Sequence, residues 1–318
     1  MGHSNIRMQS TAVTWSTSSQ TAQGLLLADP SLSNSPEFLS YVNSAIAYVN
    51  ITDLLGDSAT EFQQQQSSAL QTSLSSLVTS SSSTVQAGYQ AIYNTISNTF
   101  LSSSIGQVEI LFSPIFNGSI TIQAALQHPL SQGRIYITSA DPFAMPAIDP
   151  AYLSHAADIV ILREGLKLAR KIAQTAPLSQ FIGEELSPGS AVQSDADWEN
   201  YAANSIGTEY HPSSSCAMMP LEKGGVVDPE LRVYGLANVR VADASVFPTD
   251  FSAHVSTILP LRSVSRVVPD VFLFAAACAR VRPRRAGVRD DPRDVHDHHD
   301  FRLERLARRD HGDELDWH

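Results

Sequence analysis

Two histidines in distinctive local settings are the residues of this sequence best suited to chemistry. His211 precedes Pro212, so its backbone is biased towards an extended or turn conformation. His254 lies 43 residues further along, beyond a strand-like run at residues 239–242 and the segment that begins at Asp243. A neutral imidazole can accept a proton near pH 7, and two imidazoles can act on one substrate hydroxyl. The alternative is two unrelated histidines, but the flanking residues favour a shared site.

Those flanking residues form four ordered blocks, with related blocks upstream. The four are GTEYHPSSSCAM at 207–218, GVVDPELRVYG at 225–235, NVRVADAS at 238–245 and PTDFSAH at 248–254. The upstream blocks are HPLSQGRIYI at 128–137 and DPFAMPAIDPAYL at 141–153. Together they resemble the glucose–methanol–choline (GMC) oxidoreductases, flavin enzymes that oxidise alcohols and sugars. The local sequence is most similar to the fungal glucose-oxidase and aryl-alcohol-oxidase branch, and the resemblance extends over residues 105–262.

The resemblance implies hydride transfer from a substrate CH–OH group to N5 of FAD. His211 would be the base that takes the hydroxyl proton. His254 would hydrogen-bond the same hydroxyl and stabilise the developing alkoxide, and the pair could share these roles. Asp243 and Ala244 match the segment that approaches the FAD diphosphate and ring, while the backbone N–H of Val255 would face the isoalloxazine. Asp243 is also suited to capping a helix.

One expected part of such an enzyme is missing from the sequence. A complete family member begins with a Gly-x-Gly-x-x-Gly turn that holds the FAD pyrophosphate at a helix N-terminus. No such motif occurs here, and the one close glycine pair is Gly224-Gly225. We therefore expect the C-terminal half of a GMC enzyme, which would need its FAD-binding half for activity. The alternative is a catalytically inactive fragment.

Other chemistries have weaker support. A Ser–Asp–His hydrolase would need a Gly-x-Ser-x-Gly elbow or an equivalent, and none is present. Cys216 is better interpreted as a small buried apolar residue than as a nucleophile. Residues 294–300, DVHDHHD, could suggest a metal cluster, but a shifted reading frame or an unspliced intron explains the change of composition better. We expect no metal site.

Composition narrows the class of protein further. The 318 residues are 43% hydrophobic and carry a net charge of −11, which argues against nucleic acid as a partner. No run reaches the roughly 18 apolar residues of a membrane span. The sequons at Asn50 and Asn117 are compatible with secretion. We expect a small-molecule alcohol or sugar substrate, no membrane partner, and a secreted full-length parent.

The fold class expected is α+β. Residues 8–205 are predicted to form a substrate domain with a mainly antiparallel sheet flanked by helices. Residues 206–262 would form the return segment of an FAD-binding domain whose Rossmann half is missing. Residues 263–318, whose Arg- and Asp-rich part offers little apolar area, are predicted to be a disordered tail.

Apolar periodicity predicts the elements within this frame. Alternation predicts strands at residues 108–113, 119–123 and 134–138. Apolar residues three and four apart predict helices at 36–49 and 156–174, and two surface helices with a serine-rich joint within 57–104. A further helix is predicted from Asp195, with Ser194 as its N-cap.

Overall fold

The computed structural model describes residues 9–17, 45–115 and 119–253. His254, Val255 and the predicted tail at 263–318 lie outside the described residues, as do the sequon at Asn117 and the histidines of residues 294–300.

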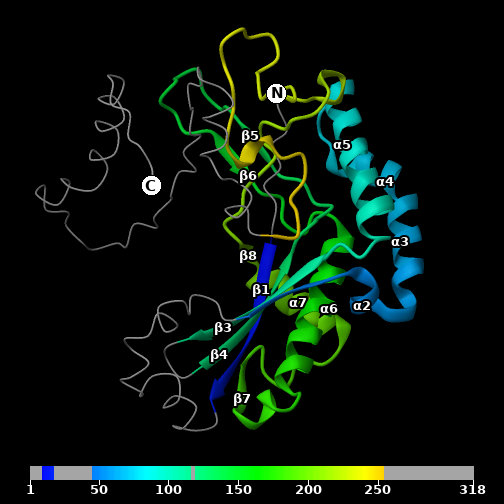
Figure 1. Cartoon of the computed structure of the whole chain (residues 1–318), viewed down its shortest axis with the longest axis vertical. Helices are drawn as coiled ribbons and strands as arrows, with labels where there is room; N and C mark the ends of the chain where they lie inside the picture. Colours follow the sequence, from blue (N-terminus) through cyan, green and yellow to red (C-terminus); the bar gives the residue numbers. More distant parts are fainter. Residues whose placement is uncertain (1–8, 18–44, 116–118, 254–318) are drawn as a thin grey trace, which may run out of the picture. The chain divides into compact units, whose positions relative to one another are not determined.

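An antiparallel sheet organises the described residues (Figure 1). Its strand order is β2-β3-β4-β1-β7, and β8 also pairs with β1. Every pairing within it is antiparallel, which confirms the predicted α+β fold class. The strands are β1 (Gln9–Thr17), β2 (Ala45–Val49), β3 (Val108–Ile115), β4 (Ser119–Leu126), β7 (Ile182–Ser187) and β8 (Gly207–Thr208).

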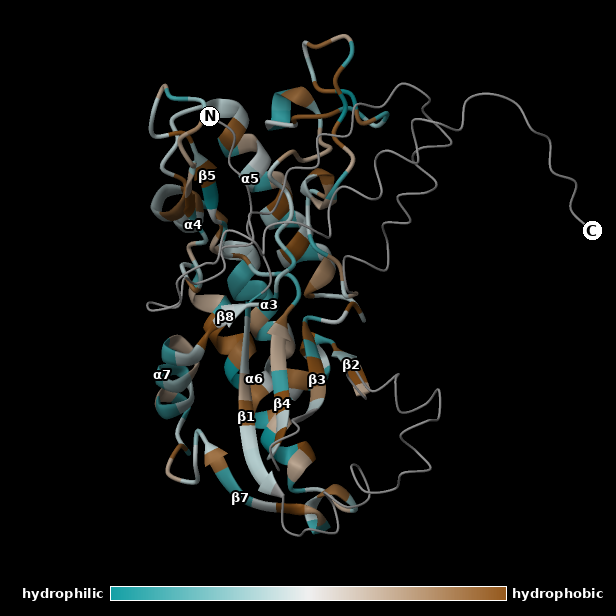
Figure 2. Ribbon diagram, turned by 90° about the vertical axis from the view of Figure 1, so that its left-hand side faces the viewer, coloured by the Kyte–Doolittle hydropathy of each residue, from teal (hydrophilic) through white to brown (hydrophobic). Residues whose placement is uncertain are grey.

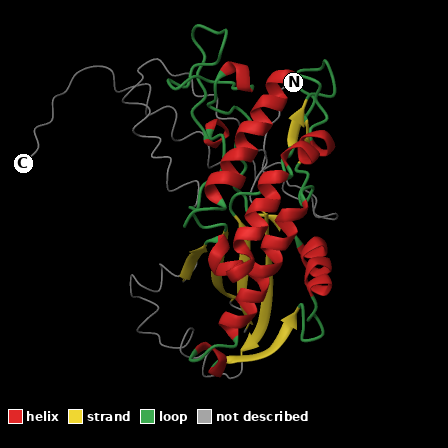
Figure 3. Cartoon of the chain, turned by 90° about the vertical axis from the view of Figure 1, so that its right-hand side faces the viewer, coloured by secondary structure: helices red, strands yellow, loops and turns green. Residues whose placement is uncertain are grey.

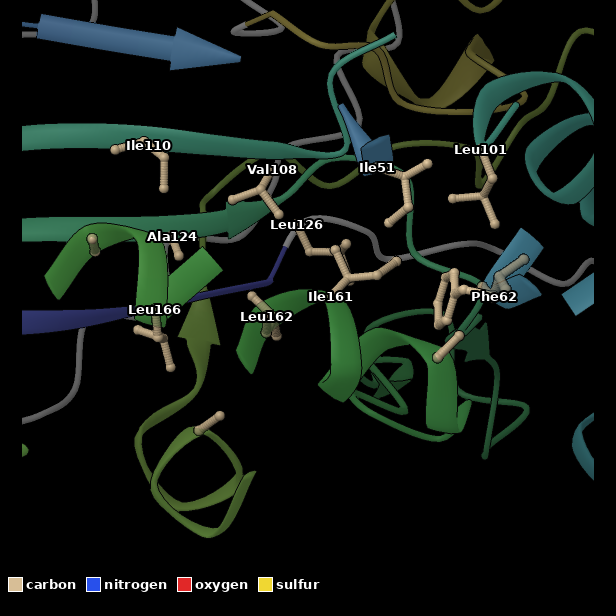
Figure 4. Close-up of a cluster of buried hydrophobic side chains, with 14 of the residues drawn as sticks. Ile51, Phe62, Leu101, Val108, Ile110, Ala124, Leu126, Ile161, Leu162 and Leu166 are labelled. Atoms are coloured by element: carbon tan, nitrogen blue, oxygen red, sulfur yellow. The ribbon is translucent and has the colours of Figure 1, made fainter. Parts of the chain in front are cut away.

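The predicted helix at 156–174 is α6 (Ala156–Ala173), which packs against the sheet (Figure 3). Its buried side chains include Ile161, Leu162 and Leu166, which meet side chains of β3 and β4 in the core (Figure 4). Gly165 brings the helix close to the sheet, since a Cβ there would lie 3.0 Å from Val108 Cγ1. The amphipathic period therefore identified the helix correctly, because one stripe of it is excluded from water.

The remaining helices also follow the sequence pattern. Helix α7 (Asp195–Ser205) begins at the predicted N-cap Ser194, whose hydroxyl and the Asp197 carboxylate form a capping box. The predicted surface helices within 57–104 are a longer series (Figure 3). It comprises α2 (Ile51–Leu55), η2 (Gly56–Ser58), α3 (Ala59–Ser68), α4 (Leu70–Leu77), α5 (Ser83–Thr95) and the π-helical turn η3 (Ile96–Phe100).

Shorter elements complete the described chain. Strands β5 (Arg134–Tyr136) and β6 (Ala147–Asp149) form a separate two-stranded antiparallel sheet. The 3-10 turns are η4 (Leu178–Gln180), η5 (Leu221–Lys223) and η6 (Ala244–Val246). None of the described helices is long and apolar enough to cross a bilayer.

Two sequence-based predictions of elements were wrong. The helix predicted at 36–49 is strand β2 over residues 45–49, paired with β3 from Ala45↔Phe112 to Val49↔Val108. A short apolar run has no decisive period, so the hydrogen-bonding partner decides its conformation. The strand-like run at 239–242 is irregular, with one isolated bridge from Arg240 to Arg232.

Candidate active-site segment

His211 lies where the chain leaves the sheet. Strand β8 pairs with β1 up to Thr208, and the Thr208 hydroxyl then accepts a hydrogen bond of 3.0 Å from the Tyr210 N–H. Tyr210 has a φ of 59°, a left-handed conformation that is uncommon for a residue with a side chain. This turn directs the chain away from the sheet, and the His211 side chain is half-buried.

The two residues after Pro212 anchor this loop. Ser213 and Ser214 are 3% and 1% exposed, and their hydroxyl oxygens lie 3.0 Å apart, within hydrogen-bond distance. Ser214 has a φ of 69°, so the chain makes a second sharp change of direction here. His211 is thus attached to a fixed, buried turn rather than to an open loop.

The His211 block and the Asp243 block lie side by side. The Cys216 N–H donates to the Ser245 carbonyl at 2.9 Å, and the Met218 N–H donates to the Val246 carbonyl at 2.8 Å. The two blocks are well separated in the sequence, and these backbone hydrogen bonds set their register. Cys216 is partly buried rather than buried as predicted, and its interpretation as a small apolar residue rather than a nucleophile stays a prediction.

Asp243 caps the turn η6. Its Oδ1 accepts a hydrogen bond of 2.9 Å from the Ser245 N–H and another from the Ser245 hydroxyl. The helix-capping interpretation of Asp243 is therefore confirmed. Ala244 is the first residue of η6 and, like Asp243, remains partly exposed. Roles of these two residues towards FAD stay predictions.

A second anchor holds the chain just before His254. The Ser252 hydroxyl donates to the Gly106 carbonyl at 2.7 Å, and His128 Nε2 lies 3.2 Å from the Ser252 hydroxyl oxygen. A hydroxyl has one proton to donate, so His128 Nε2 must be the donor in its own bond. His128 is 2% exposed and packs against Phe100, with ring centroids 4.6 Å apart and ring planes tilted by 55°.

His211, Asp243 and Ala244 thus all lie in the described residues 206–253, where two backbone hydrogen bonds hold the His211 block beside the Asp243 block. His254 and Val255 lie outside the described residues. Sequence reasoning missed His128 as an anchoring residue, although it opens the HPLSQGRIYI block. Within the described ranges, no three His, Cys, Asp or Glu side chains gather as metal ligands would.

Comparisons with known proteins agree with this arrangement. Residues 129–259 match the model of the GMC oxidoreductase C-terminal family. The GMC oxidoreductase family protein Mala s 12 of Malassezia sympodialis is 46% identical over 234 residues, which cover 74% of this chain and 37% of that protein. Glucose oxidase of Aspergillus carbonarius is 37% identical over 134 residues, which cover 41% of this chain and 22% of that enzyme.

Solved structures show the same fold. A fungal aryl-alcohol oxidase superposes with a TM-score of 0.70 at 23% identity, covering 80% of this chain and 46% of the oxidase. An FAD-dependent oxidoreductase from Chaetomium thermophilum gives a TM-score of 0.68 at 20% identity, covering 84% and 48%. The chain thus spans less than half the length of these relatives. By its matched residues and its 46% identity to the Malassezia protein, the chain belongs to the GMC oxidoreductases and carries their C-terminal domain.

Proposed function

We propose that this chain supplies the proton-transfer residues and the substrate domain of an FAD-dependent oxidoreductase that acts on the CH–OH group of an alcohol or sugar. The observation that carries the proposal is the backbone pairing of Cys216 with Ser245 and of Met218 with Val246. This pairing joins the block that contains His211 to the block that contains Asp243. Residues 8–205 would form the substrate domain and residues 206–262 the return segment.

In this proposal His211 takes the proton of the substrate hydroxyl. Its imidazole is half-buried, which leaves one part of the ring accessible while the turn at Ser213 and Ser214 fixes its position. His254 hydrogen-bonds the same hydroxyl. The anchor of Ser252 to Gly106, two residues before His254, supports a fixed position for this second ring. Both roles require hydrogen-bond reach of one substrate oxygen.

The residues present could accommodate the flavin ring of FAD, but they offer no binding site for its pyrophosphate. Ala244 is small and half-exposed at the start of η6, so a flat ring can approach the backbone there. Asp243, Ala244 and the N–H of Val255 would face the cofactor. The pyrophosphate needs a cradle of backbone N–H groups, and the sequence has no Gly-x-Gly-x-x-Gly turn to form one. When bound, FAD would supply the hydride acceptor.

Exposed apolar side chains support the need for a second half. In the return segment they include Tyr210 at 84% exposure and Leu221 at 58%. Near β5 and β6 they include Ile137 at 80% and Phe143 at 92%. Figure 2 colours the ribbon by the hydropathy of each residue and labels β5. Monomeric proteins rarely leave large apolar patches in water. We propose that these side chains pack on the FAD-binding half, and that the complete protein is secreted.

The test is reconstitution of this chain with a GMC dinucleotide-binding half, supplied in trans or fused in frame. The chain alone should be colourless with added FAD, because the pyrophosphate cradle is absent. The reconstituted protein should show a flavin absorption band that alcohols or sugars bleach. Stopped-flow absorbance then measures the rate of flavin reduction.

His211→Ala should slow flavin reduction roughly 10²–10⁴-fold, the usual effect of losing a positioned base. Lys171→Ala in the last turn of α6, an exposed residue outside the proposed site, is the control and should leave the rate unchanged. A normal rate in His211→Ala would remove this histidine from the mechanism. A yellow, reducible preparation of the chain alone would place its cofactor site elsewhere, and a reconstituted protein that no alcohol or sugar reduces would favour an inactive fragment.

A further inference from the structure

Helix α5 and the turn η5 make an unusually close backbone contact. Gly88 is buried in α5, and a Cβ built on it would lie 2.5 Å from the Lys223 carbonyl oxygen, closer than real Cβ atoms approach. Gly224 makes the reciprocal approach, since its Cβ would lie 3.2 Å from the Thr84 carbonyl oxygen. Only glycine fits the contact at Gly88 without a shift of one of the two backbones.

Beside this contact the space between α5 and η5 is not completely filled. A cavity of about 340 Å³ lies between them, and its lining includes Val85, Tyr89, Ser214 and Met219. The close approach at Gly88 is the contact that limits how near η5 can come to α5.

Turn η5 is in turn tightly connected to the candidate site. The Gly225 N–H donates to the Pro220 carbonyl at 3.1 Å, and a Cβ on Gly225 would lie 1.8 Å from the Met219 carbonyl oxygen. The Tyr234 hydroxyl donates to that same Met219 carbonyl at 3.2 Å. A displacement of η5 must therefore move Met219 and its neighbour Met218, whose N–H is bonded to Val246.

We infer that Gly88 is a positioning residue for the candidate active site. It allows α5 to hold η5 at one distance, and η5 holds the pairing of residues 216 and 218 with residues 245 and 246. The structural part of this inference stands by itself. Its consequence for catalysis rests on the proposed function.

Gly88→Ala should change the stability of the fold in the direction opposite to that expected from helix propensity. In a helix interior alanine is normally more stable than glycine. Here the added methyl group must push α5 and η5 apart, so the variant should be less stable than the unaltered chain. Amide hydrogen exchange of the full chain should also rise about tenfold at Cys216 and Met218, relative to the core amides Ile122 and Ala124, which report global opening.

Gly165→Ala is the matched control. Gly165 is also a buried helical glycine, but its Cβ would meet Val108 Cγ1 at 3.0 Å and the Ala124 Cβ at 3.1 Å in the core. It should leave the exchange of residues 216 and 218 relative to the core unchanged, whichever way it changes the stability of the fold. If Gly88→Ala does not fold, amide exchange of the unaltered chain still tests whether η5 is held by α5. Its amides at 216 and 218 should exchange together with those of α5, and much faster exchange at 216 and 218 would overturn the inference.

The catalytic readout is separate. In the reconstituted enzyme, Gly88→Ala should lower the rate of flavin reduction at saturating substrate by about tenfold and leave KM within about twofold, because the base is misplaced rather than the binding surface lost. If the unaltered enzyme reduces no flavin, the proposed function fails while the exchange result still decides the positioning role. A stabilised Gly88→Ala variant with unchanged exchange would refute the positioning role itself.

Discussion

Among the described ion pairs, we expect the one between Arg170 and Glu185 to contribute most to the stability of the fold. The Arg170 side chain extends from α6 to Glu185 on β7, with Nε to Oε2 at 2.9 Å and Nη2 to Oε1 at 2.6 Å. Its Nη1 donates to the Val192 carbonyl at 2.6 Å, and the guanidinium lies 4.1 Å from the ring centroid of Trp198. The two charged side chains are only 11% and 10% exposed. Arg170 therefore connects α6, β7, α7 and the loop before α7.

Arg170→Met should destabilise the fold by about 3–5 kcal/mol, because it leaves the Glu185 carboxylate buried without its cation. At about 2–4 °C per kcal/mol for a domain of this size, the melting temperature should fall by roughly 6–20 °C. Arg170→Met/Glu185→Met should recover much of the loss, since apolar side chains of similar volume often replace a buried ion pair at little cost.

Urea unfolding followed by tryptophan fluorescence measures both variants. Lys167→Met is the control on the same helix. Its Asp195 partner is 60% exposed, and such pairs contribute about 1 kcal/mol or less. Its other partner, Glu164, keeps an ion pair with Arg163. If Arg170→Met costs no more than Lys167→Met, or if the double variant is less stable than the single one, the reasoning from burial is wrong.

Two further predictions concern helix ends. Burial lowers the pKa of His155 below 6.5, and its Nδ1 already accepts the Ala157 N–H. The unfolded chain then binds the proton more tightly than the folded one. The stability that the neutral His155 ring contributes is therefore complete above about pH 6.5 and is lost as the pH falls from there through the lower pKa of the folded state, by at most about 1.4 kcal/mol per unit. Buried Asp158 opposes the shift, and His155→Asn should abolish this pH slope in urea titrations. Ser194→Ala should cost about 1 kcal/mol in thermal unfolding, and no change would deny its capping role.

The sequence by itself determined the elements that depend on local physics. The apolar stripe of α6 and the capping box at Ser194 are set by residues within a few positions of one another, so the predicted helix at 156–174 differs from the observed one by a single residue. The strands β3 and β4 were predictable from the alternating apolar residues in their sequences. Their burial was not, because the structure buries both faces of β4 and successive residues of β3, whereas alternation predicts one buried face. The GMC family was evident from the motif blocks around His211 and Asp243.

The tertiary structure decided what depends on partners distant in the chain. Residues 45–49 became a strand because β3 supplied their hydrogen bonds, which no local period could show. The pairing of Cys216 with Ser245 and the contact of Gly88 with Lys223 join segments whose separation is fixed only when the whole domain packs. A sequence names the residues able to do chemistry, but their distances arise from long-range packing, and local propensities do not contain that information.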